Sequence, residues 1–574
     1  MLLATLWPAV LGAFVALASA KQATRTTVAK RQGPEDIRFV TTENGRFTVN
    51  GGPLNFVGTN AYWLHTLNTD DDIDYTLGNI SRAGIKVVRT WAFNDVTSIP
   101  EDGVWFQLLA NDGIQINEGP NGLQKLDKVV ELAEKHGVFL LLALTNNWNP
   151  DPLVDDINIG AGPVRRTDIK LRNNDKPPRN FLSNDYGGMD TYVRHFGLKD
   201  HEEFYTNEKV INAFKNYTAT LVKRYANSPA IFGWELANDA RCNSTLAASS
   251  CNPKIVTKWH SEIAQHVGAN DPNHLVASGA GGQLCIECPK LFPIPPPPPP
   301  PAPSPAPGLR RRSASRGFFT KAEIIQRRAQ LRKRNRLAKR KSKPSGGVRI
   351  RGRWNAAPAR RQEDINELGS QLDGSFGVDS EDILNIPQIG FGSFQLFPDQ
   401  NPYGADDPDL TPLENLIQKG DEWIRLHAEA SDRFNKPTAL NGFGVVTNDH
   451  APDFVPFNST EAPFASDSGG TPEVQPFGLT ATERDEAYSA WLNTGASTGL
   501  TSMIQYQWGQ QGLSVQPGST VSEASGSVGV GEDDGVLGVS PNDGYSANGV
   551  GQESLLATLE EGVQNFAADT RRRR

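Results

Sequence analysis

The chain has 574 residues and a formal net charge of −8 at pH 7. This length suits several small domains or one large unit such as an α/β barrel. The charge is uneven, because residues 310–361 hold 20 Lys and Arg against the single Glu323. The remaining body is acidic, which argues against nucleic acid as a partner of the folded part.

The N-terminus resembles an export signal. An apolar run from Met1 through Leu11–Ala20 ends in the small-residue sequence Ala18-Ser19-Ala20, and it is too short to span a membrane. Lys30-Arg31 is a candidate dibasic processing site. We therefore expect a signal peptide at 1–20, a propeptide at 21–31, and a secreted protein, extracellular or in the cell wall, with no membrane span.

Short apolar runs alternate with helical patterns along the chain, which predicts a (β/α)8 TIM barrel. One helix is expected to be capped by Asn121 and to end at Gly137. The expected helices are Gly122–Lys135, Val210–Ala226, Ile255–Val267, Leu413–Ala430 and Glu483–Thr494. The expected strands are Asn55–Asn60, Lys86–Trp91, Phe139–Leu144, Ile231–Leu236, Leu275–Ser278, Gly392–Leu396, Thr438–Leu440 and Met503–Trp508.

Two inserts interrupt the barrel pattern. Asn149–Asn184 reads as a long loop after the third strand, on the face where barrel enzymes bind their substrates. Residues 293–361 are Pro-rich and then Arg/Lys-rich, and we expect them to be disordered. This insert is a solvated linker, a tether for anionic surfaces, or an artefact of the gene model. It separates the two parts of the barrel, 32–292 and 362–566, and a basic tail follows at 567–574. The Gly/Ser-rich stretch Ser519–Gly535 reads as a loop.

Four cysteines fit an exported protein. Their spacing suggests the pairs Cys242–Cys251 and Cys285–Cys288, although four cysteines allow three connectivities. A zinc site at Cys285 and Cys288 needs two further ligands, so disulfides are favoured. Glycosylation sequons begin at Asn79, Asn216, Asn243 and Asn458.

The expected strand ends carry Arg, amide and aromatic side chains. Aromatic faces and amide groups suit sugars, whose rings stack and whose hydroxyls form hydrogen bonds. We therefore expect a substrate-binding cleft made of Trp63, Arg89, Trp91, Asn147, Trp148, Asn238, Gln395, Phe397, Tyr506 and Trp508. The large rings could equally pack in the barrel core.

Several segments resemble glycoside hydrolase family 5, and within it the fungal endo-β-1,4-mannanases. They occur in the family's order: Val57-Gly-Thr-Asn-Ala-Tyr-Trp63, Val88-Arg-Thr-Trp-Ala-Phe93, Asn121-Gly-Leu-Gln-Lys-Leu-Asp127, Asn146-Asn-Trp148, Asp185-Tyr-Gly-Gly188, Trp234-Glu-Leu-Ala-Asn238, Asp271-Pro-Asn-His-Leu275 and Tyr506-Gln-Trp-Gly509. The resemblance implies a retaining β-mannanase fold without a metal, nucleotide or redox cofactor.

The resemblance also places the catalytic positions. Arg89 and Asn238 match the family's arginine and substrate-binding asparagine, whereas the acid/base glutamate is replaced by Asp239 and the nucleophile by Gly442. The family's His-Leu-Tyr-Pro reads Gln395-Leu-Phe397-Pro here, and an indole under the reactive sugar falls at Tyr506.

These replacements differ in their consequences. Retaining hydrolysis needs two carboxyls about 5–5.5 Å apart, and glycine supplies none. Asp239 keeps a carboxyl but shortens its reach by ~1.5 Å, and a misplacement of that order costs about 100-fold or more. Asp239 either retains an acid role or forms a structural contact, by pairing with Arg241 or by capping a helix. Glu235 lies within a strand, and we expect it to be a structural ion-pair partner.

The sequence thus predicts a monomeric mannanase-like protein that binds β-1,4-mannan or a related polysaccharide, with hydrolysis weak or lost. One alternative is an active mannan endo-1,4-β-mannosidase that uses Asp239 and a second carboxylate, for which Asp185, Asp399 and Asp449 are loop candidates. Another alternative is a wall-surface interaction protein that acts through its basic insert.

Overall fold

The computed structural model describes residues 39–110, 113–150, 178–294, 320–341, 348–350, 353–355, 369–459, 476, 478–516, 519–523, 537–546 and 553–572. These residues all belong to the compact unit Arg38–Arg574. The expected signal peptide and propeptide, and most of the two predicted inserts, lie outside the described residues.

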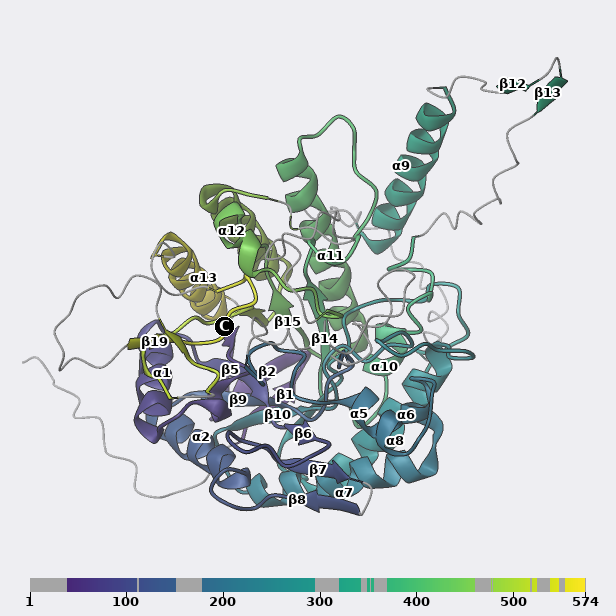
Figure 1. The fold of residues 1–574 in the computed structure, drawn as a ribbon. Coiled ribbons are helices and arrows are strands. Elements are labelled where there is room, and N and C mark those ends of the chain that lie inside the picture. The colour runs from purple at the N-terminus through teal and green to yellow at the C-terminus, as the bar shows by residue number, and fades with distance from the viewer. Residues whose placement is uncertain are drawn as a thin grey trace, which may run out of the picture. The chain divides into compact units, whose positions relative to one another are not determined.

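Eight parallel strands form the central sheet (Figure 1). In chain order they are β4 (Phe56–Asn60), β5 (Val87–Trp91), β9 (Phe139–Ala143), β10 (Ile231–Glu235), β11 (Leu275–Ala277), β14 (Gly392–Leu396), β15 (Thr438–Phe443) and β16 (Ser502–Gln505). Strand β16 pairs with β4, and a parallel bridge between Ala277 and Phe391 joins β11 to the start of β14. The sheet therefore closes on itself, and the prediction of a (β/α)8 barrel is confirmed.

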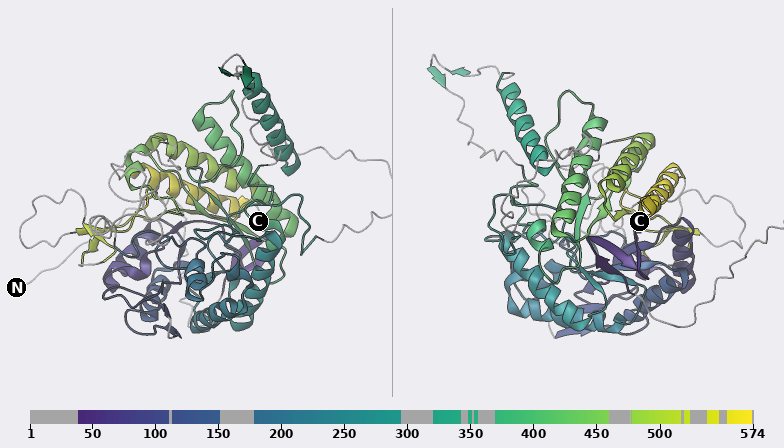
Figure 2. Two further views of the ribbon diagram at one scale, coloured as in Figure 1. Left: turned by 45° about the vertical axis from the view of Figure 1, so that its right-hand side comes forward. Right: turned by 180° about the vertical axis from the view of Figure 1, so that it is seen from behind.

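Helices surround this sheet, as the two further views in Figure 2 show. Their apolar stripes pack on the strands, which are buried on both sides, as parallel strands usually are. They are α1 (Asp70–Arg82), α2 (Leu123–His136), α5 (Met189–His195), α6 (Glu203–Thr206), α7 (Glu208–Tyr225), α8 (Pro253–Asn270), α10 (Ser380–Leu384), α11 (Pro412–Phe434), α12 (Ala481–Thr498) and α13 (Glu553–Arg572), with 3-10 turns η1 (Leu64–Thr66) and η2 (Asn448–Asp453).

Local sequence explains several helix ends. Thr69 caps α1 with Asp72 in a reciprocal capping box, and α11 and α12 begin with the corresponding box formed by a Thr and a Glu three residues later. Helix α2 ends at Gly137, whose φ of 66° is the left-handed conformation that glycine adopts easily. The expected cap at Asn121 is wrong, because α2 starts after Gly122 without a side-chain cap.

A small antiparallel sheet and a phenylalanine cluster pack at the amino ends of the strands. This sheet comprises β1 (Thr41–Glu43), β2 (Arg46–Val49) and β3 (Gly52–Pro53). Phe47 of β2 is fully buried, with its ring centroid 5.0 Å from those of both Phe232 and Phe391. These apolar contacts stabilise the end of the barrel that does not carry the expected site.

Further strands lie in loops outside the barrel. Strands β6 (Asp95–Val96), β7 (Gln107–Ala110) and β8 (Gly113–Ile116) form one sheet, and β17 (Gln511–Ser514), β18 (Ser522–Glu523) and β19 (Leu537–Val539) form another. The predicted loop Ser519–Gly535 thus contributes a short strand where it is described. Strands β12 (Val348–Ile350) and β13 (Arg353–Asn355) pair with each other.

The basic insert contains a helix that docks on the barrel, so the prediction of disorder is wrong for residues 320–341. Helix α9 (Lys321–Lys341) packs against α11 and buries Ile324 completely. Arg328, which is 4% exposed, donates to Glu422 at 3.4 Å, and Arg327 donates to the same carboxylate at 3.0 Å. Acidic partners on α11 therefore replace the wide apolar face that the sequence of α9 lacks.

The C-terminal boundary also differs from the prediction. Helix α13 continues through residues 567–572, which the sequence assigned to a separate basic tail. Its residues Leu555, Leu559 and Phe566 are buried in the same cluster as residues of α11 and α12. These buried residues make α13 part of the fold, although its last residues are basic.

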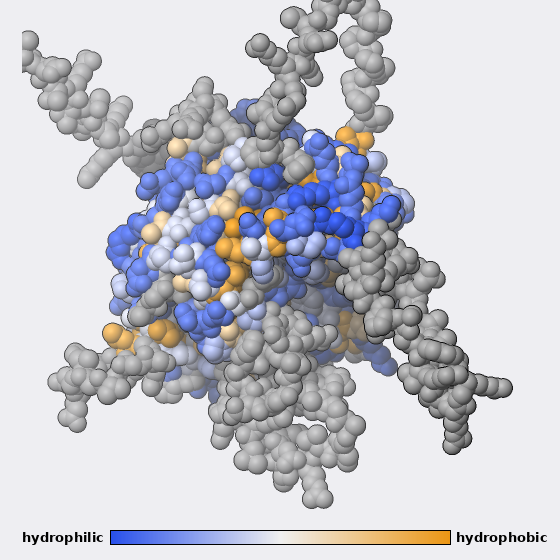
Figure 3. Space-filling model, turned by 90° about the horizontal axis from the view of Figure 1, so that it is seen from above, coloured by the Kyte–Doolittle hydropathy of each residue, from blue (hydrophilic) through white to orange (hydrophobic). Residues whose placement is uncertain are grey.

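None of the helices in the described part of the chain combines the length and the apolar character that a membrane crossing requires. The face shown in Figure 3 is largely hydrophilic, with a small central group of hydrophobic residues. Small apolar groups of this kind are ordinary on folded proteins.

Candidate active site at the carboxyl end of the barrel

An ion pair between Arg89 and Glu235 lies inside the carboxyl end of the barrel. Arg89 lies on β5 and Glu235 lies on β10, and their side chains are 2% and 0% exposed. Arg89 Nε donates to Glu235 Oε2 at 2.9 Å, and its Nη1 donates to Asn60 Oδ1 at 3.0 Å. Asn441 Nδ2 donates to the same Glu235 oxygen at 3.0 Å. Glu235 is therefore the structural ion-pair partner that its place in a strand predicts.

Asn238 extends this network and uses its own side-chain groups within the protein. Its Oδ1 accepts from Arg89 Nη2 at 2.8 Å and from Gln395 Nε2 at 2.9 Å. Its Nδ2 donates to Asn146 Oδ1 at 2.8 Å. The structure therefore brings three of the expected polar contacts together, namely Arg89, Asn238 and Gln395, and joins them to one another.

Asp239, which the resemblance places at the family's acid/base position, is 1% exposed. Its φ of 58° lies in the left-handed region, which costs a non-glycine residue about 1 kcal/mol or more. Its Oδ2 accepts from Trp148 Nε1 at 3.0 Å and pairs with the Arg241 guanidinium. The Arg241 guanidinium also lies over the Trp148 ring, 5.2 Å from its centroid. The structural alternative for Asp239, pairing with Arg241, is thus the arrangement observed.

Gly442 lies on β15 directly beside Phe397, at the position where the resemblance places the family's nucleophile. A Cβ atom built at Gly442 would lie 3.0 Å from Phe397 Cζ and 3.2 Å from Cε2. The Phe397 ring is buried and makes edge contacts with Phe457, Tyr506 and Tyr545, with centroids 5.1 to 5.5 Å apart. Glycine and phenylalanine therefore fit each other here, and a side chain at position 442 would require the ring to shift by a few tenths of an ångström.

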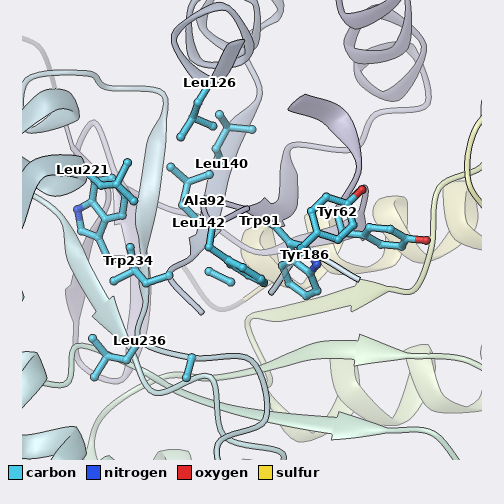
Figure 4. Close-up of a cluster of buried hydrophobic side chains, with 14 of the residues drawn as sticks. Tyr62, Trp91, Ala92, Leu126, Leu140, Leu142, Tyr186, Leu221, Trp234 and Leu236 are labelled. Carbon is cyan, nitrogen blue, oxygen red and sulfur yellow. The ribbon is translucent and has the colours of Figure 1, made fainter. Parts of the chain in front are cut away.

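The expected stacking residues are mostly buried. Trp63, Trp91, Tyr506 and Trp508 are between 0% and 3% exposed. Each finds a polar partner, and Tyr506 Oη donates to Asp543 Oδ2 at 2.6 Å. Figure 4 shows Trp91 grouped with the rings of Tyr62 and Tyr186, whose centroids are 5.8 Å apart. In this conformation the four rings pack in the interior instead of facing solvent.

Asn147 and Trp148, two further residues predicted to contact the substrate, differ in their exposure to solvent. Trp148 remains partly exposed beside Asp239. Asn147 is fully buried, and its Oδ1 accepts from the Arg241 backbone N–H at 3.1 Å while its Nδ2 donates to the Asn243 carbonyl at 3.1 Å. Asn147 therefore holds the loop after β10, and Trp148 is the more accessible of the two.

Sequence reasoning missed Asp543, which lies at the centre of the polar contacts around Tyr506. Burial raises its pKa to about 6, against hydrogen bonds from Tyr506, Ser183 and Gln507 that lower it. Asp543 lies in a Pro-Asn-Asp-Gly segment just after β19 (Leu537–Val539), outside the eight barrel strands whose ends were searched for site residues.

The loop carboxylates named from sequence occupy three different settings. Burial raises the pKa of Asp185 to about 6, although Arg179 and the Asn180 backbone lower it. Asp399 is buried and accepts from the Val446 backbone N–H at 3.0 Å. Asp449 is exposed on η2. A pKa near 6 is compatible with general acid chemistry, so Asp185 and Asp543 are the carboxyls of interest for an alternative mechanism.

The cysteines form the two pairs that their spacing suggests. Cys242 bonds to Cys251 and Cys285 bonds to Cys288, with Cα atoms 5.5 and 5.3 Å apart. These bonds leave no thiolate at Cys285 or Cys288 for the zinc alternative.

The sequons differ in their access to solvent. Asn216, Asn243 and Asn458 are exposed, whereas Asn79 is partly buried and donates to Gln510 Oε1 at 3.1 Å. The first three are therefore the more accessible glycosylation candidates.

Comparisons with known proteins point to one family. Residues 37–293 match the family described as GH family 5 beta-mannosidase-like. Mannan endo-1,4-beta-mannosidase A of Podospora anserina is 38% identical over 238 residues, which are 41% of this chain and 52% of that protein. Mannan endo-1,4-beta-mannosidase F of Aspergillus fumigatus is 37% identical over 247 residues, which are 42% of this chain and 47% of that protein. The chain thus spans about half the length of these relatives.

Solved structures support the fold. The endo-1,4-beta-mannanase from Rhizomucor miehei aligns with a TM-score of 0.55 at 22% identity, covering 92% of this chain and 99% of that one. The endo-beta-1,4-mannanase from Thermotoga petrophila aligns with a TM-score of 0.50 at 20% identity, covering 90% and 78%. The family match by sequence ends before β14 and so includes Asp239 but not Gly442. Over residues 37–293 the chain is thus similar to the GH family 5 beta-mannosidase-like family, and its closed barrel has the fold of these solved mannanases.

Proposed function

We propose that this protein binds β-1,4-mannan or a related cell-wall polysaccharide and that its retaining hydrolysis is weak or lost. The relatives that it matches are named mannan endo-1,4-beta-mannosidases, which supports mannan as the ligand class. The observation that carries the loss of hydrolysis is the contact between Gly442 and Phe397. An aromatic ring lies 3.0 Å from the point where the side chain of a nucleophile would begin.

The chemistry of double displacement explains why the residue at position 442 matters for hydrolysis. One carboxylate must attack the anomeric carbon, while a second carboxyl about 5–5.5 Å away protonates the leaving oxygen. Gly442 offers no attacking group, and the apolar Phe397 ring beside it cannot stabilise an oxocarbenium ion as an anion would. Asp239 alone would leave general acid catalysis, which contributes typically about 10²–10⁴-fold.

The Asp239 side chain, at the acid/base position, is also shorter than a glutamate and already bonded within the protein. The aspartate side chain is shorter than glutamate by one C–C bond, ~1.5 Å. Its Oδ2 already accepts from Trp148 and pairs with Arg241. An acid must reach the glycosidic oxygen within hydrogen-bond distance, and these two donors already engage Oδ2 of the Asp239 carboxylate.

The second candidate function is an active mannan endo-1,4-β-mannosidase that uses Asp239 and another carboxyl. The raised pKa values of Asp185 and Asp543, both about 6, favour these two as the groups to test. The third candidate, adhesion through the basic insert, finds less support. Lys321, Arg327, Arg328 and Arg334 of α9 already pair with carboxylates of the barrel.

We further propose that the protein is secreted to the medium or the cell wall and is a monomer. The N-terminal apolar run supports the first part of this proposal. The two disulfides support it as well, because such bonds persist in oxidising compartments.

The test is release of reducing sugars from β-1,4-mannan and glucomannan by the mature protein, beside retention on a mannan affinity gel. An Asp239→Asn variant probes the acid/base position, and Asp432→Asn on α11 is the matched control because that carboxylate is exposed and has no proposed role. We expect retention on mannan without sugar release from any of the three proteins. Sugar release that disappears only in Asp239→Asn would overturn the loss of hydrolysis, and absence of retention would overturn the binding proposal.

A further inference from the structure

A histidine lies buried beside the loop that follows β10 and carries Asp239 and Arg241. His201, in the turn between α5 and α6, is 0% exposed. Its Nδ1 lies 2.6 Å from Asp190 Oδ1, and its Nε2 lies 3.0 Å from Asn147 Oδ1. Each ring nitrogen therefore faces a side-chain oxygen, so the protons on the two nitrogens decide whether the buried ring is neutral or charged.

The side-chain amide of Asn147 has only one orientation that satisfies its neighbours. Its Oδ1 accepts from the Arg241 backbone N–H at 3.1 Å, and its Nδ2 donates to the Asn243 carbonyl at 3.1 Å. Turning the amide over would place two donors together at Arg241 and two acceptors together at Asn243. Asn147 thus presents an oxygen to His201, and Nε2 must carry a proton to bond with it.

The group on the other side of the ring is an ionised carboxylate. Asp190 Oδ2 accepts from Ser244 Oγ and, at 2.6 Å, from Thr245 Oγ1. Burial raises the pKa of Asp190, but hydrogen bonds from His201, Ser244 and Thr245 outweigh burial and hold the pKa below its usual range. An ionised carboxylate only accepts hydrogen bonds, so Nδ1 of His201 must carry a proton as well.

A neutral ring would leave one of these buried contacts unmade. A bare Nδ1 would face the Asp190 carboxylate, and a bare Nε2 would face Asn147 Oδ1. Tyr205 Oη lies 3.3 Å from Nε2, but it donates its hydrogen to the Arg241 carbonyl at 2.9 Å. Two buried acceptors that face each other lose their water without gaining a bond, whereas an imidazolium donates two charge-assisted bonds here.

The residues around His201 fix the position of Arg241. Asn147 accepts from the backbone N–H of Arg241, and Tyr205 donates to its carbonyl, so both backbone groups of this residue are held. The Arg241 guanidinium in turn pairs with Asp239. His201 therefore supports the acid/base position through Asn147 and Arg241, without contacting Asp239 itself.

We propose that His201 is a buried imidazolium that positions Arg241 beside Asp239 at the candidate site. Among the described residues, the titratable and charged groups around it are Asp190 of α5, Tyr205 of α6, and Arg241 and Asp239 of the loop. This inference goes beyond mannan binding and does not depend on it, because it concerns the charge and the support of the site itself.

The experiment is nuclear magnetic resonance on the full-length protein with isotope-labelled histidine and tryptophan, at about pH 7, where an ordinary histidine is mostly neutral. The variants are His201→Gln and Ser244→Ala, which removes one donor to Asp190. His266→Gln is the matched control, because His266 is a partly buried histidine of α8 outside this cluster. Trp148→Phe identifies the indole signal of Trp148.

We expect one histidine ring with protons on both nitrogens, lost in His201→Gln and kept in His266→Gln. The Trp148 indole signal should shift in His201→Gln alone of these two, because the Arg241 guanidinium lies over that ring, 5.2 Å from its centroid. Ser244→Ala should shift the Nδ1 proton of the same histidine.

A single ring proton on His201 overturns the imidazolium. Two ring protons with an unmoved Trp148 signal in His201→Gln overturn the positioning role. If His201→Gln does not fold, Ser244→Ala decides the charge state, because a doubly protonated ring that this variant leaves unshifted is not His201 and overturns the proposal.

Discussion

Asp543 provides a quantitative test of the chemistry around Tyr506. Its carboxyl is buried and accepts from Tyr506 Oη at 2.6 Å, from Gln507 Nε2 at 2.5 Å and from Ser183 Oγ at 3.2 Å. Asp543→Asn keeps the shape of the side chain and removes its titration. The Asn oxygen can still accept from Tyr506 and Ser183, so this variant is expected to fold.

The size and sign of the change in the free energy of unfolding with pH follow from the pKa of Asp543. Burial raises the pKa of Asp543 from 3.8 to about 6. Below 3.8 the group is protonated in both the folded and the unfolded chain. As the pH rises from 3.8 to about 6, the unfolded chain releases this proton first, which favours unfolding. The free energy of unfolding therefore falls by about 3 kcal/mol across this window and shows no further change from this group above it.

Urea unfolding from about pH 3 to about pH 7 measures this contribution. Other titrating groups are common to both proteins, so they cancel in the difference between the wild type and Asp543→Asn. We expect the stability of the wild type relative to the variant to decrease by about 3 kcal/mol as the pH rises. Parallel pH profiles would show that Asp543 titrates normally in the folded state and would refute the reasoning.

Three other substitutions test separate contacts. Glu235→Gln leaves the buried Arg89 charge uncompensated and is expected to lower the free energy of unfolding by about 3–5 kcal/mol in urea. Gly442→Glu forces its side chain against Phe397 and should lower the free energy of unfolding in urea by about 1–3 kcal/mol without restoring mannan hydrolysis; equal stability would mean that the ring moves aside freely. Glu422→Gln removes the carboxylate beneath α9, so trypsin should cleave that helix faster than in the wild type; equal cleavage would mean that the ion pairs do not hold it.

The predictable parts of this protein are those that local pattern controls. Apolar runs such as Phe139–Ala143 identify barrel strands because parallel strands are buried on both faces. Helix α9 shows where pattern fails, since its sequence lacks an apolar stripe and predicts disorder. The acidic residues of α11 that hold it lie nearly a hundred positions away, as in the separation of 95 residues between Arg327 and Glu422.

The candidate site also has features that the sequence predicts and features that it cannot predict. The identity of the residue at each strand end is visible in the sequence, so the lack of a carboxylate at position 442 could be read from it and the ion-pair role of Glu235 could be predicted. Whether an aromatic ring faces a sugar or the core could not. That choice depends on what covers the ring, and for Trp91 the cover is Ser183, 92 positions later in the chain.

The sequence by itself determined the barrel, its family resemblance and the absence of a carboxylate at position 442, because each of these is a local pattern or the identity of one residue. Tertiary structure alone decided that Asp239 pairs with Arg241 and that Phe397 fills the space beside Gly442. It also decided that Trp91 bonds to the Ser183 carbonyl and that Asn184 bonds to the Phe457 carbonyl, 273 positions away. The physical reason is that hydrogen bonds and packing act over a few ångströms in space, and folding brings distant segments within that range.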